Sequence, residues 1–154
     1  LTGLSAIINA FIPEAVVLPI LVFVGISSYS QAFEVVDKKY FPAVIMASLP
    51  VVMDFIVDNM KEGALPGFTA FDPGSAFVGL LVGCVFVFII DNNWKNASIT
   101  NGAALALTAI GMIHSPGILG TEGYAPDMGF IQVYIVLIIV FAVMHVTGFN
   151  RKKA

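Results

Sequence analysis

Long apolar stretches separated by short charged connectors are the feature that most constrains this fold. Hydrophobic residues make up 58% of the chain and charged residues 11%, whereas soluble domains average roughly 45–50% and about 25%. The stretches between connectors approach the roughly 20 residues that cross a hydrocarbon core. A soluble domain of this size could not bury so much apolar surface. The composition therefore predicts an all-α integral membrane protein, a polytopic helix bundle in a lipid bilayer.

Prolines, glycines and polar connectors divide the chain into five full transmembrane helices and a truncated one at its N-terminus. Residues 1–11 are apolar but would span only about 16 Å as a helix. We therefore expect half a crossing there, and a fragment of a longer protein. The full helices are expected over residues 13–33, 42–57, 73–90, 97–113 and 128–146. Residues 1–154 are thus expected to form a single transmembrane region.

The positions of lysine and arginine predict the orientation. One set of alternate connectors, together with the C-terminal tail, carries six basic residues, whereas the other set carries Lys61 alone. The six are Lys38, Lys39, Lys95, Arg151, Lys152 and Lys153. Because basic connectors stay on the cytoplasmic side, we expect the C-terminus of this multi-pass protein in the cytoplasm and the helices in the cell (inner) membrane. No basic patch of the kind that binds nucleic acid occurs.

A few polar side chains within the expected helices are candidates for a substrate pathway. Ser27, Ser30 and Gln31 form a polar patch in the cytoplasmic half of the helix over 13–33, and Asp54 is a carboxylate inside the helix over 42–57. The patch could line a hydrated path or bond to a neighbouring helix. Alternatively, the serines bond to their own helix, and Asp54 reaches water at the outer end of its span.

Small residues recur every fourth position at Ser75, Gly79 and Gly83, on one face of the helix over 73–90. Such a pattern lets another backbone approach closely. We therefore expect a helix-packing surface there. The neighbour is either another helix of this chain or a second copy in a homo-oligomer.

Signatures of catalysis and of metal binding are missing from the sequence. There is no G-x-S-x-G elbow, H-E-x-x-H pair, phosphate-binding loop or dinucleotide fingerprint. Neither His114 nor His145 has metal-ligand spacing to another histidine, cysteine or acid, and Cys84 is the single cysteine. We expect a protein that is not an enzyme and that holds no metal or cofactor.

Several motifs resemble the later helices of the xanthine/uracil permease family of nucleobase transporters. They are LTGLSAIINAFIPEAVVLPILVFVG from residue 1, SQAF at 30–33, YFPAV at 40–44, VFVFIIDNNW at 85–94 and AIGMIH at 109–114. Together they cover most of the chain, and the nearest likeness is to a bacterial branch of the family.

The resemblance implies a place in a larger inverted-repeat secondary transporter. In such permeases the substrate is held upstream of the matched segment, while the remaining helices form a gate or scaffold. The chain would then need the missing N-terminal transmembrane core of the same protein, and proton or sodium coupling would belong to the full-length transporter. No substrate-binding residue carries over. Two alternatives stay open: a small membrane subunit that packs against a larger partner, and part of a non-nucleobase carrier or channel.

Overall fold

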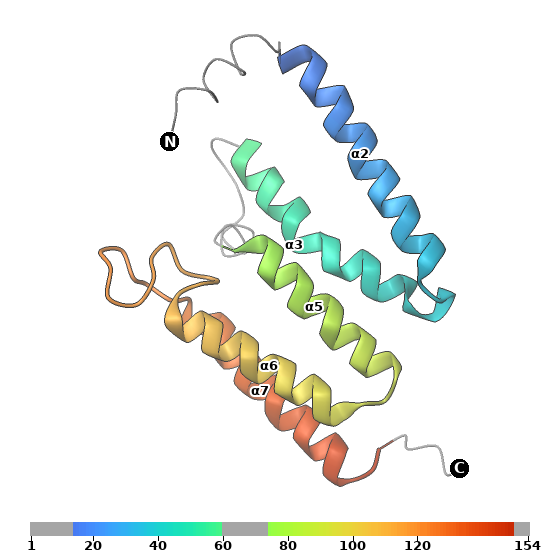
Figure 1. Cartoon of the computed structure of the whole chain (residues 1–154). Helices are drawn as coiled ribbons and strands as arrows, with labels where there is room; N and C mark the ends of the chain where they lie inside the picture. Colours follow the sequence, from blue (N-terminus) through green and yellow to red (C-terminus); the bar gives the residue numbers. More distant parts are fainter. Residues whose placement is uncertain (1–13, 60–73, 150–154) are drawn as a thin grey trace. The chain divides into compact units, whose positions relative to one another are not determined.

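A computed structural model describes residues 14–59 and 74–149, and regular structure in these residues is helical throughout (Figure 1). The expected all-α fold is confirmed for this part of the chain. Its five α-helices are α2 (Glu14–Val35), α3 (Phe41–Asn59), α5 (Ser75–Ile90), α6 (Trp94–Ile110) and α7 (Met128–Val146), and a short 3-10 helix, Lys38–Tyr40, precedes α3. The helix expected over residues 1–11 lies outside the described residues.

The chain divides into two compact units, residues 1–38 and residues 39–154. In the first unit the described structure is α2 and the residues that follow it. Pro19 lies inside this helix, where it removes one backbone hydrogen bond. The side chains of Phe23 and Ile26 are exposed, so α2 presents a largely apolar surface.

In the second unit, helices that follow one another in sequence pack side by side. α3 contacts α5, α5 contacts α6, and α6 contacts α7. Lys39 pairs with Asp91, which brings the start of α3 to the end of α5. The indole of Trp94 donates to the carbonyl oxygen of Phe149 at 2.8 Å, which brings the start of α6 to the end of α7. Successive helices therefore run in alternate directions.

Two described segments are long and apolar enough to cross a membrane, Lys38–Val57 and Met128–Val146. α5 is also apolar but has 16 residues. Core helices of soluble proteins can match the two segments in length and composition, but such helices are buried. Here only 11% of the first segment's most apolar stretch and 6% of the second's are buried.

Capping residues set helix ends that differ from the expected ones. α6 begins at Trp94 rather than at residue 97, because the side chain of Asn93 accepts from the backbone N–H of Asn96 and caps the first turn. It ends at Ile110 rather than at residue 113, because Gly111 takes a left-handed conformation with φ 83°, a common helix stop. α5 is described from Ser75, and the expected start at residue 73 lies outside the described residues.

Candidate functional site: polar side chains within the helix bundle

The contact between α3 and α5 places two of the expected site residues together. The hydroxyl of Ser75, which is buried, donates to a carboxylate oxygen of Asp54. Asp54 is itself partly buried near the end of α3, and Ser75 opens α5. The carboxylate therefore has a hydrogen-bond partner on the neighbouring helix instead of relying on water alone.

Gly79 and Gly83 lie on the same face of α5, against Ala47 of α3. A Cβ atom built on Gly79 would overlap the carbonyl oxygen of Ala47, and one built on Gly83 would lie 2.9 Å from the Ala47 Cβ. The absence of side chains on these two residues thus lets the two backbones approach. Ser75, Gly79 and Gly83 all face α3, a helix of this same chain.

The remaining candidates, Ser27, Ser30 and Gln31, lie on α2 in the first unit. Ser30 and Gln31 are exposed and Ser27 is partly exposed. The neighbouring Ser28 donates to the carbonyl oxygen of Val24 in its own helix, at 2.8 Å. A substrate pathway through this patch remains a prediction.

A charged cluster joins the connectors at one end of the second unit. One carboxylate oxygen of Asp91 accepts from Lys39 Nζ at 2.9 Å and from the Tyr40 hydroxyl at 2.8 Å. Lys39, and after it Tyr40, holds the pKa of Asp91 below its usual value, because both hydrogen bonds favour the charged carboxylate. The cluster thus ties the entry of α3 to the exit of α5.

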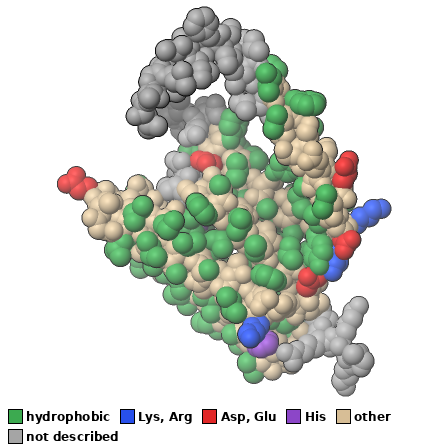
Figure 2. Space-filling model, in the orientation of Figure 1, with side chains coloured by type: hydrophobic (Ala, Val, Ile, Leu, Met, Phe, Trp, Pro, Cys, Tyr) green, Lys and Arg blue, Asp and Glu red, His purple; other side chains and the backbone are tan. Residues whose placement is uncertain are grey.

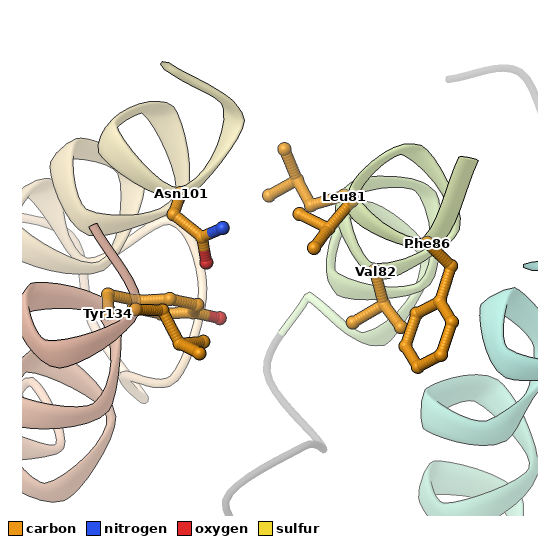
Figure 3. Close-up of a pocket in the computed structure, with 7 residues that line it drawn as sticks. Leu81, Val82, Phe86, Asn101 and Tyr134 are labelled. Carbon is orange, nitrogen blue, oxygen red and sulfur yellow. The ribbon is translucent and has the colours of Figure 1, made fainter. Parts of the chain in front are cut away.

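A pocket with a volume of about 130 Å³ lies between α5, α6 and α7 (Figure 3). Figure 3 shows Asn101 and Tyr134 on one side of it, and Leu81, Val82 and Phe86 of α5 on the other. Val85 and Leu137 complete the lining. The walls are therefore mostly aliphatic and aromatic, with one amide and one phenol.

The two polar residues of this pocket are almost completely buried. Asn101 is 2% exposed and Tyr134 is 9% exposed. The Asn101 amide nitrogen donates to the carbonyl oxygen of Ala97 at 2.9 Å. The Tyr134 hydroxyl lies 2.9 Å from Nε2 of His114, and the ring of Phe130 stacks on that imidazole with centroids 3.8 Å apart.

No motif or spacing in the sequence marks Asn101, Tyr134 and His114 as a group. Asn101 lies at the middle of α6, a helix otherwise rich in small residues. An amide side chain at the middle of a membrane helix often bonds to a neighbouring helix, and this is the signal by which the sequence could have indicated it. His114 follows the end of α6, with φ 55°. Its pairing with Tyr134, a residue of α7, depends on how the intervening connector folds.

Comparisons of the chain with models of known protein families, with curated proteins and with solved structures find no match.

Proposed function

We propose that this chain is a multi-pass helical region of a cell membrane, in which it forms gate or scaffold helices of a secondary transporter. The observation that carries the membrane assignment is the distribution of side chains in the second unit. α7 exposes most of its large aliphatic residues, namely Val133, Ile135, Val136, Ile139, Val140, Val143 and Val146. Figure 2 shows hydrophobic side chains spread over the visible face of this unit.

Several polar side chains of this unit are buried instead. Asn101, Thr108, His114 and Ser115 are 4% exposed or less. A soluble protein places its aliphatic residues inside and its polar residues outside. In lipid the outward face is apolar, and polar side chains bond within the bundle. The exposed aliphatic residues of α7 and these buried polar residues support our placing the second unit in a membrane.

The proposed orientation follows from the basic connectors. Lys39 and Lys95 lie at the same end of the second unit, because Lys39 pairs with Asp91 and Lys95 lies in the first turn of α6, shortly after Asp91 in the chain. This end would face the cytoplasm of a bacterial cell, together with the C-terminus. The connector between α6 and α7, which includes Glu122, would face the opposite side.

The transporter assignment rests on the motifs that resemble xanthine/uracil permeases. The close crossing of α3 and α5 at Gly79 supports a scaffold role, because closely packed backbones form a firm surface against which other helices can move. The nucleobase would be held by helices elsewhere in the full-length transporter, since no substrate residue of the family carries over to this chain. The chain alone is expected not to transport.

Cysteine labelling tests the membrane topology. With the single Cys84 replaced by serine, Lys95→Cys and Glu122→Cys form a matched pair on opposite ends of the second unit. A membrane-impermeant maleimide should label Glu122→Cys in intact spheroplasts and Lys95→Cys only after permeabilisation. Labelling of both positions in intact spheroplasts, or extraction of the protein by carbonate at high pH, would contradict the proposal.

Uptake assays test the substrate. The full-length protein is expected to take up labelled uracil or xanthine, and the same cells without it are the control. Uptake of sulfate but of no base would replace the nucleobase assignment with an anion carrier. Stable copurification of the chain with a different, larger membrane protein would instead support the small-subunit alternative.

A further inference from the structure

We propose that the pocket between α5, α6 and α7 binds a small molecule that has one six-membered aromatic ring and one hydrogen-bond donor. The ring would lie against Leu81, Val82 and Leu137, and the donor would bond to the amide oxygen of Asn101. This inference does not depend on the transporter assignment, because it rests on the pocket alone.

The size of the pocket matches one ring. Its volume is about 130 Å³, and an apolar cavity of about 150 Å³ is large enough to bind benzene. The lining comes from the middle of three helices, around Val82 in α5, Asn101 in α6 and Leu137 in α7. Because these helices hold the walls from both sides, the pocket is built by the bundle and not by a surface loop.

The polarity of the pocket calls for a donor on the ligand. Asn101 is 2% exposed, and its side-chain nitrogen donates to Ala97. An asparagine amide also has an oxygen that accepts hydrogen bonds, and this oxygen is at the pocket wall. A ligand N–H or O–H in the pocket could donate to this oxygen.

Other occupants suit the pocket less well. A lipid acyl chain would fill the apolar part but would give the Asn101 oxygen no donor. Water would supply a donor, but an ordered buried water needs two to four polar partners. Of the seven lining residues two are polar, Asn101 and Tyr134, and the Tyr134 hydroxyl is already bonded to His114. A ring with one donor satisfies both the walls and the amide.

Tyr134 gives the pocket a firm polar edge. Its hydroxyl is held by His114, and the imidazole is in turn stacked on Phe130. These contacts fix the phenol ring of Tyr134 as one wall of the pocket. The ligand ring can then pack against a surface that is already ordered, which lowers the entropic cost of binding.

The test compares two probes that differ in one group, 4-fluorophenol and 4-fluorotoluene. The whole chain is placed in nanodiscs, binding is followed by fluorine NMR titration, and empty nanodiscs give the correction for partitioning into lipid. Asn101→Leu removes the acceptor and keeps the bulk of the side chain. We expect this substitution to lower the ratio of phenol affinity to toluene affinity about 5- to 10-fold, the value of one hydrogen bond.

A second pair of variants tests the location. Leu81→Trp fills the pocket and should weaken both probes at least about tenfold. Leu80→Trp places the same ring at the adjacent position, which is 63% exposed, and should leave both affinities unchanged. Circular dichroism checks that all variants keep their helices.

Two results would overturn the proposal. The first is an affinity ratio that is the same in the native chain and in Asn101→Leu, because the amide would then not contact the ligand. The second is binding that Leu81→Trp and Leu80→Trp alter equally, because the probes would then bind at the lipid-facing surface and not in the pocket.

Discussion

Gly79 of α5 lies against the backbone carbonyl of Ala47 in α3, so closely that a β-carbon on Gly79 would overlap the oxygen. The obstacle is backbone and not the end of a flexible side chain, so it cannot move aside by a change of rotamer. The separation of α3 and α5 therefore depends on the absence of a side chain at this position.

We expect Gly79→Ala to lower the free energy of unfolding by about 1–3 kcal/mol, the usual cost of overpacking a close contact. Gly102→Ala is the matched control in α6, because a Cβ there would meet no atom within 4 Å. This control should be neutral or stabilising by up to about 1 kcal/mol, since alanine is the better helix former. Unfolding by SDS, followed by circular dichroism, measures both. Equal stability of the two variants would contradict the close crossing.

The hydrogen bond between Ser75 and Asp54 is expected to couple α3 to α5. A double-mutant cycle with Ser75→Ala and Asp54→Ala should give a coupling energy of about 1–2 kcal/mol, because a charged acceptor strengthens the bond. The control cycle pairs Asp54→Ala with Ser98→Ala on α6, which should be additive within about 0.5 kcal/mol. A coupling energy near zero in the first cycle would show that Asp54 is solvated by water instead.

The charged cluster at Asp91 predicts a pH dependence of stability. Its pKa in the folded protein is lowered, first by Lys39 and then by Tyr40. The unfolded chain therefore binds a proton at higher pH than the folded chain does. The stability that the cluster contributes is fully present above the pKa of Asp91 in the unfolded chain, about 3.9. It is lost as the pH falls through the folded pKa.

Unfolding midpoints measured between neutral pH and about pH 3 check this sign. The native protein should be more stable than Asp91→Asn at neutral pH, and the difference should shrink below about pH 4. Replacement of the exposed Glu122 by glutamine is the control and should leave the shape of the native curve unchanged. Parallel curves for the native protein and Asp91→Asn would show that the cluster does not contribute.

Trp94 is expected to stabilise the end of the bundle where α6 begins. Its ring stacks on Phe141, with centroids 6.1 Å apart, and its N–H bonds to Phe149. Trp94→Phe should cost about 1 kcal/mol, because it removes the hydrogen bond and keeps most of the packing. Trp94→Ala should cost about 3 kcal/mol or more, because it also leaves a cavity. Chemical or thermal unfolding, followed by circular dichroism, gives both free energies. Equal costs for the two variants would show that packing of the ring does not stabilise the bundle.

The sequence determined the helical nature of the described residues. Uncharged stretches of nearly 20 residues between turn residues can satisfy their backbone groups within one helix, and the long aliphatic run predicts a helix over residues 128–146, the bounds that α7 has in the structure. The small residues Gly79 and Gly83 were also evident as a repeat on one helix face. The repeat alone does not distinguish contact with a helix of this chain from contact with a second copy.

The tertiary structure decided which residues meet. Asp54 and Ser75 are 21 positions apart, and Lys39 and Asp91 are 52 apart. No local pattern specifies such pairs, because they follow from the packing of successive helices. Gly111 also required the structure, since glycine is tolerated within a helix and ends it only where the chain adopts positive φ. Asn101 became a candidate ligand-binding residue for the same reason, when α5 and α7 enclosed a pocket around its amide.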